Sequence, residues 1–181
     1  MAKIRAIALI GQSADSILSR LTDILAKRAE LFGISVTVID LLQEDSKTKL
    51  ITCLESGRPS FCFSFQGIGM GLRVEAGNLW TSLNIPFISL MGDAPFYAPY
   101  LHAAEGPTLF HVYASEDFRQ FYCDIMGGKN FSSVFGGFYP PNPLADETPW
   151  HDRDLEIVYV KTGVDSESLR AKWTEFPNKL R

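Results

Sequence analysis

The sequence predicts an α/β protein, a Rossmann-like three-layer αβα domain with a mostly parallel sheet. Short, continuously apolar runs alternate along the chain with segments whose apolar residues have the spacing of one helical face. The apolar runs end at glycine or polar turn residues and do not alternate internally with polar side chains, which is typical of parallel strands buried on both faces. Right-handed crossovers between such strands would place helices on both sides of the sheet.

The predicted strands are the apolar runs rich in branched and aromatic side chains. We expect them at residues 4–10, 34–39, 60–65, 87–90, 109–113 and 131–135. We expect the intervening helices at residues 17–32, 45–55, 72–83 and 116–125.

Each predicted helix has its own signals. The first carries one apolar face and ends at Gly33, and the second, a weaker pattern, ends at the turn of residues 56–59. The third depends on apolar residues between Leu72 and Leu83. Ser115 is suited to be the N-cap of the fourth, which begins with acidic residues that favour the positive end of the helix dipole.

The composition changes after Phe138, and this predicts a domain boundary. Residues 1–138 form the predicted Rossmann-like N-terminal domain, and residues 139–154, with four prolines, read as a linker or an extended surface segment. Residues 155–181 carry a strand pattern followed by a short helix pattern. These last elements either begin a second domain that this chain lacks or pack back on the first domain.

Composition and charge exclude several classes of function. The net charge of −4 and the absence of a lysine or arginine cluster argue against a nucleic-acid binder. No apolar run approaches the roughly 20 residues of a membrane span. The three cysteines lack metal-ligand spacing and are typical of reduced thiols in a cytoplasmic protein. No histidine pair has a metal-binding spacing either, so we expect no metal site.

Asp93 is the best single candidate for a functional residue. The predicted strand before it ends abruptly in Gly-Asp-Ala-Pro, which places one carboxylate at the carboxyl end of a strand. Ligands bind at this edge in open α/β sheets. Asp93 could accept a proton from a substrate hydroxyl or hydrogen-bond a sugar. The alternative is that it caps a short helix starting at Pro95.

Other polar groups belong to loops that end at the same edge. The glycines of Gly67-x-Gly69-x-Gly71 could present amides to an anion at a helix N-terminus, or they could form a tight turn with close packing. They do not form the dinucleotide fingerprint. His102 follows an aromatic segment at residues 96–100 and could reach the cleft as a second catalytic candidate. The candidate substrate-binding residues are Gln12, Ser13, Gln66, Gly67, Gly69, Tyr97 and Glu116.

Three motifs between Phe61 and Asn142 carry a family resemblance. They are Phe63-Ser64-Phe65 before the glycine loop, Ile85-Pro86-Phe87-Ile88-Ser89 leading to Asp93-x-Pro95, and Gly127-Gly128-Lys129-Asn130 before a strand. In this set the chain resembles the N-terminal half of the bacterial spore-maturation-protein-like (CgeB-like) glycosyltransferases, which have the two-domain GT-B fold. It departs from the family pattern at Leu90, where an aromatic residue is usual, and at residues 135–138.

The resemblance implies the acceptor-side domain of a glycosyltransferase that transfers a sugar to an acceptor hydroxyl. Residues 155–173 would match the start of the second domain, which binds the nucleotide-sugar donor in that family. This chain would then hold no cofactor and would not turn over alone. Its partners would be a small-molecule or glycan acceptor and the missing C-terminal domain. Asp93 would be the base, with His102 behind it.

Two other functions remain open from the sequence. A flavodoxin-like or FMN-reductase-like protein is one, because Gly11-x-Ser13-x-x-Ser16 after the first strand could hold a flavin phosphate. The glycine-rich segment at residues 66–71 offers no aromatic ring to stack on a flavin, which argues against it. A non-catalytic Rossmann-like interaction module is the other.

Overall fold

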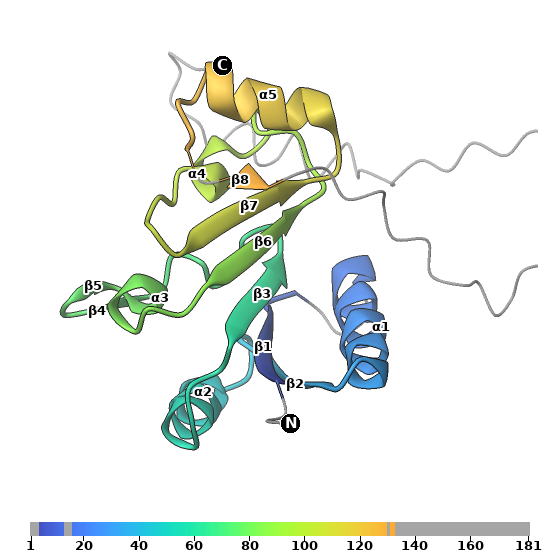
Figure 1. Ribbon diagram of the computed structural model, residues 1–181, viewed down its shortest axis with the longest axis vertical. Helices are drawn as coiled ribbons and strands as arrows, with labels where there is room; N and C mark the ends of the chain where they lie inside the picture. The colour runs from blue at the N-terminus through green and yellow to red at the C-terminus, as the bar shows by residue number, and fades with distance from the viewer. Residues whose placement is uncertain (1–3, 13–15, 130, 133–181) are drawn as a thin grey trace, which may run out of the picture. The chain divides into compact units, whose positions relative to one another are not determined.

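The fold was obtained as a computed structural model that describes residues 4–12, 16–129 and 131–132 (Figure 1). The described part confirms the α/β class. Its elements, in chain order, are β1 (Ile4–Ile10), α1 (Ile17–Leu31), β2 (Ile34–Asp40), α2 (Ser46–Glu55), β3 (Phe61–Phe65), β4 (Arg73–Val74), β5 (Gly77–Asn78), α3 (Leu79–Ser82), β6 (Phe87–Met91), α4 (Pro99–His102), β7 (Leu109–Tyr113), α5 (Glu116–Asp124) and β8 (Phe131–Ser132).

The main sheet is parallel at every described pairing and has the strand order β2-β1-β3-β6-β7-β8. Counting only its own strands along the chain, this is the doubly wound order 2-1-3-4-5 with a sixth strand added. The direction of winding reverses between β1 and β3. That position is the topological switch point, where open α/β sheets form a crevice at the carboxyl ends of their strands.

Helices cover both faces of the sheet, as expected for a three-layer arrangement. Alternate residues of each strand point to opposite faces. Ile7, Leu9 and Phe87 pack on the face that α2 and α3 cover. Met91 and Tyr113, on the same face, pack against α5. Figure 1 shows α1 on the opposite side of the sheet from α2.

Trp80 of α3 belongs to the larger of the two hydrophobic cores, the one that also contains Ile7, Leu9 and Phe87. Its side chain is fully buried, and its ring centroid lies 5.1 Å from that of Phe87. The indole Nε1 donates a hydrogen bond of 2.8 Å to the carbonyl of Gly69, so burial leaves no polar atom of this ring unsatisfied. The core is therefore tied directly to the loop that follows β3.

The prediction of a helix over residues 72–83 is wrong except at Leu79–Ser82. The chain instead forms the β4–β5 hairpin, closed by a hydrogen bond from the Leu79 amide to the Leu72 carbonyl, and then the four-residue α3. Gly77 has a φ of 112°, a backbone conformation that breaks a helix. Asn78 then caps α3, because its side chain accepts hydrogen bonds from the amides of Trp80 and Thr81.

Some predictions fall outside the described residues. β8 lies within the strand predicted at residues 131–135, of which residues 133–135 are not described. The linker at residues 139–154 and the elements at residues 155–181 also lie outside. The other predicted strands and the first helix agree with the structure to within one residue at each end.

Candidate functional site

The loops after β3, β6 and β7 come from the same edge of the sheet, because their strands are parallel. The loop after β6 carries Asp93, whose side chain is exposed. Within the described residues its carboxylate makes no hydrogen bond and no ion pair. Helix α4 begins at Pro99 and has Ala98 as its N-cap, so the capping role considered for Asp93 is wrong. The carboxylate is thus available to a ligand.

The backbone around Asp93 is held in place by its neighbours. Ala94 and Pro95 are buried, and the amide of Tyr97 donates a hydrogen bond of 3.0 Å to the Ala94 carbonyl. Gln66, at the end of β3, lies against the start of this loop, since its Nε2 is 3.5 Å from the place that a Cβ on Gly92 would take. The structure therefore brings two of the predicted site residues, Asp93 and Gln66, to neighbouring positions.

Gln66 has an unusual conformation for a residue with a side chain. Its φ is 55°, in the left-handed region that is uncommon outside glycine. The backbone amide of Gln66 donates a hydrogen bond to the Leu90 carbonyl. Its side-chain oxygen, Oε1, is buried and has no hydrogen-bond partner among the described residues. Strained backbone and unsatisfied polar atoms are typical of functional sites.

An exposed group of aromatic side chains follows Asp93, and we call Phe96, Tyr97 and Tyr100 the aromatic turn. Their exposed fractions are 59%, 78% and 75%, respectively. The Phe96 ring contacts the ring of Tyr97 and, edge to face, that of Phe121 on α5, with centroid distances of 4.7 and 5.9 Å. The predicted site residue Tyr97 therefore lies on the surface beside Asp93.

The glycine loop after β3 is a packed turn. The amides of the residues that follow the three glycines, Ile68, Met70 and Leu72, donate to carbonyls three residues back, so these amides are used within the turn. A Cβ on Gly69 would lie 2.4 Å from Leu9 Cδ1, which shows how closely this backbone packs on β1. No helix follows directly, since α3 begins at Leu79. These contacts favour the packing interpretation of Gly67 and Gly69 over anion binding.

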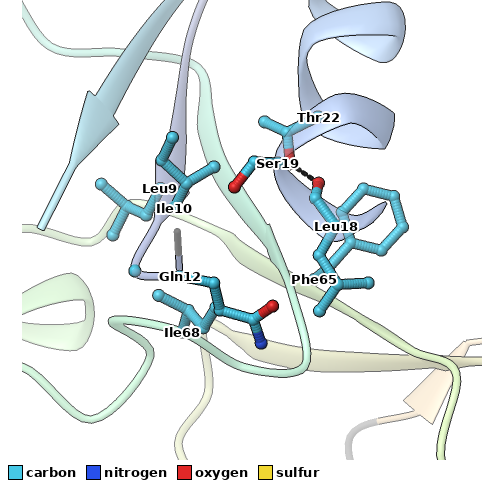
Figure 2. A pocket seen from close by; sticks show the side chains of 9 residues that line it. Leu9, Ile10, Gln12, Leu18, Ser19, Thr22, Phe65 and Ile68 are labelled. Carbon is cyan, nitrogen blue, oxygen red and sulfur yellow. Dashed lines mark hydrogen bonds between the residues drawn. The ribbon is translucent and has the colours of Figure 1, made fainter. Parts of the chain in front are cut away.

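A small hollow at the switch point is lined partly by Gln12 (Figure 2). It has almost no room for even a water molecule, and most of the side chains around it are apolar. On its α1 side, Thr22 is held by a hydrogen bond of 2.8 Å from its Oγ1 to the Leu18 carbonyl. Ser16 is the N-cap of α1 and accepts a hydrogen bond from the Ser19 amide. Ser13 lies outside the described residues.

Glu116 is held by its own helix. It forms an ion pair with Arg119, one turn along α5, and this hydrogen bonding lowers the pKa of the Glu116 carboxyl. The side chain is exposed. Its observed partner is thus a helix neighbour, as expected for an acidic residue in a first turn.

A buried histidine–tyrosine cluster lies behind the aromatic turn, and we define it as His102, His111, Tyr113 and Tyr122. His102 Nδ1 is 3.0 Å from the Tyr113 hydroxyl, and the two rings are stacked. Burial, with a smaller effect of His111, lowers the pKa of His102 to about 4, so this imidazole is neutral at pH 7. The structure thus places His102 in the interior, where it ties α4 to β7, and not on the surface of the cleft.

His111 occupies the centre of this cluster. Its Nε2 donates to the Ala104 carbonyl at 3.3 Å, which leaves Nδ1 as a lone-pair acceptor, and burial lowers its pKa. Neither His111 Nδ1 nor the Tyr122 hydroxyl has a hydrogen-bond partner among the described residues, although the two rings meet at 5.1 Å. The sequence indicates only one part of this cluster: His111 and Tyr113 are two residues apart in a strand and therefore point to the same face of the sheet.

We expect the two buried tyrosines of the cluster to differ in how the loss of the hydroxyl changes the stability of the fold. We expect Tyr113→Phe to lower the free energy of unfolding by about 1 kcal/mol, because His102 loses its partner. Tyr122→Phe should leave stability unchanged or raise it, since its buried hydroxyl has no described partner. Urea denaturation followed by circular dichroism measures both. Equal destabilisation by the two variants would contradict this account of the cluster.

The described residues form a doubly wound α/β domain whose exposed carboxylate and aromatic rings lie at the carboxyl edge of a parallel sheet. Neither the models of known protein families nor the sequences of curated proteins match the chain. In the described part, no group of three or more metal-ligating side chains comes together. None of the described helices is long and apolar enough to span a membrane.

Proposed function

We propose that this chain is the acceptor-side N-terminal domain of a nucleotide-sugar-dependent glycosyltransferase. One observation carries the proposal: Asp93 presents an exposed carboxylate without a described partner at the carboxyl end of β6, directly before exposed tyrosines. A carboxylate in this position suits a base for a hydroxyl group. The sequence resemblance to spore-maturation-protein-like glycosyltransferases supports the same interpretation.

The chemistry proposed for Asp93 is a proton transfer. A carboxylate oxygen of Asp93 accepts the proton of the acceptor hydroxyl while the hydroxyl oxygen attacks the anomeric carbon of the donor sugar. The bond between the anomeric carbon and the phosphate oxygen breaks, and the nucleoside diphosphate leaves with the electron pair. The donor would be held by a second domain. Closure of that domain over this edge would exclude water and strengthen the contact between carboxylate and hydroxyl.

Release of nucleotide tests this proposal. The protein encoded by the complete reading frame is incubated with UDP-, dTDP- and GDP-linked sugars, and the nucleoside diphosphate set free is measured. We expect release from at least one donor, and none from residues 1–181 alone. A folded full-length protein that releases no nucleotide from any of these donors would contradict the proposal.

Flavin binding is a second candidate, and the strand order favours it. Flavodoxin-like sheets have the order 2-1-3-4-5 found here and bind FMN at the switch point between their first and third strands. Two observations argue against it. The hollow at this position has almost no room for even a water molecule, and Ser16 is used as a helix cap. Titration of FMN with the protein decides, because bound flavin changes its fluorescence. Micromolar binding would favour this candidate over the transferase.

A further inference from the structure

We infer that the acceptor recognised at this site is a neutral carbohydrate, bound by Asp93 together with Tyr97 and Tyr100. The role of this carbohydrate as acceptor rests on the proposed function. The binding of the carbohydrate is independent of that function, because all three residues belong to the described part of this chain.

The two tyrosines are highly exposed, so their rings are not explained by a role in the core. Tyr97 and Tyr100 are 78% and 75% exposed, whereas Tyr113 and Tyr122 in the same domain are buried. An exposed aromatic ring contributes little to the core, and clustered exposed rings mark binding surfaces. The apolar faces of a tyrosine can stack on the C–H face of a pyranose, while its hydroxyl bonds to sugar oxygens. The adjacent carboxylate of Asp93 can accept hydrogen bonds from sugar hydroxyls.

Contacts within the domain hold the backbone that carries these rings. Phe96, the first residue of the aromatic turn, rests on Phe121, and the Leu101 amide donates a backbone hydrogen bond of 2.9 Å to the Ala98 carbonyl. His102, at the end of α4, bonds to Tyr113 on β7. A backbone held by such contacts loses little conformational entropy on binding, which suits the weak contacts of sugar recognition.

The charges of the described residues near the aromatic turn disfavour an anionic ligand. Exposed acidic residues stand on the loop after β6 and on α5, namely Asp93, Glu116, Asp117 and Asp124. The cation of α5, Arg119, is engaged by Glu116. A phosphate, a sulfated glycan or a nucleic acid would meet like charge here.

The arrangement of the rings argues against a cationic ligand. Quaternary ammonium groups bind in cages of aromatic rings that face one another. The rings of Tyr97 and Tyr100 make no contact with each other in the described structure, and both are open to solvent. Each ring is therefore exposed by itself, and an exposed ring face suits the C–H face of a sugar.

Binding to residues 1–181 tests the inference directly. Cellohexaose and chitohexaose serve as neutral probes, a heparin hexasaccharide as the anionic probe and choline as the cationic probe, and calorimetry with NMR titration measures Kd. We expect at least one neutral hexasaccharide to bind at millimolar concentration. Tyr97→Ala and Tyr100→Ala should each weaken this binding about tenfold.

Phe32→Ala is the matched control and should leave the affinity unchanged. Phe32 is 80% exposed, close to Tyr97, but it lies at the C-terminal end of α1, at the opposite edge of the sheet. The inference is overturned if neither neutral probe binds, if the tyrosine variants bind as well as the wild type, or if heparin or choline binds more tightly than both sugars.

The outcomes separate this inference from the proposed function. Nucleotide release by the full-length protein without carbohydrate binding by this chain would overturn the neutral-carbohydrate acceptor and leave the transferase intact. Carbohydrate binding that depends on both tyrosines, without nucleotide release, would confirm the binding site and contradict the transferase.

Discussion

Replacing Gly128 by alanine is expected to lower the free energy of unfolding by about 3 kcal/mol, at the upper end of the cost of overpacking a core. A Cβ at this position would lie 2.0 Å from the Cε1 and Cζ atoms of Tyr122. The ring of Tyr122 is buried against Tyr113 and His111, and the Gly128 amide donates a hydrogen bond of 3.1 Å to the Tyr122 carbonyl. Neither the ring nor the backbone can move away without loss of these contacts.

Urea denaturation measures this effect, and Gly71→Ala is its control. Gly71 is exposed, its φ is not positive, and nothing lies within 4 Å of the place that its Cβ would take. We expect the control to change stability by less than about 0.5 kcal/mol. If the two alanine variants unfold at the same urea concentration, the packing of Gly128 on Tyr122 is not as described.

Replacing Asp93 by asparagine is expected to lower the rate of sugar transfer by about 10²- to 10⁴-fold, the range for loss of a general base. Asparagine keeps the size of the side chain and removes its ability to take a proton. Because Asp93 is exposed and has no described partner, stability should change by less than about 0.5 kcal/mol. A loss of activity would therefore report on chemistry and not on folding.

Asp23→Asn provides the matched control for this variant. Asp23 is also exposed, but it lies on α1, on the opposite side of the sheet from α2. We expect its transfer rate to stay within about twofold of the wild type, since a surface charge away from the reacting atoms affects the rate only weakly. Wild-type turnover by the Asp93 variant would remove Asp93 as the base.

The strands were predictable because each is an apolar run that ends at glycine or at polar residues, and burial on both faces demands that composition. The order of the strands was not predictable in the same way. It depends on which strands pair across the sheet, and no local pattern records that choice. The structure shows an order of flavodoxin type, with the switch point between β1 and β3.

The helix predicted at residues 72–83 failed because its apolar spacing has another cause. All three apolar residues contribute to the core, but Leu72 does so from just before a hairpin that contains Gly77, and Leu79 and Trp80 from the short helix after it. Spacing alone does not distinguish these cases, although a glycine within the pattern weakens a helix prediction. Tertiary packing decided the local structure here.

The position of Asp93 followed from one local rule, the carboxyl end of a buried strand. The pairing of His102 with Tyr113 joins α4 to β7 and could not be inferred from either segment alone. His102 looked available to the cleft because it follows an aromatic run, and the structure shows it to be buried. Exposure depends on packing between segments, and this limits the prediction of a site from sequence.

Formation of a glycosylated product is the direct test of Asp93 as the base of a sugar transfer. The full-length protein is given a nucleotide sugar and a neutral oligosaccharide, and the mass of the oligosaccharide is measured for the wild type and for Asp93→Asn. We expect a product heavier by one sugar residue with the wild type and almost none with the variant. Equal product from both proteins, or no product from the wild type with any donor and acceptor pair, would contradict it.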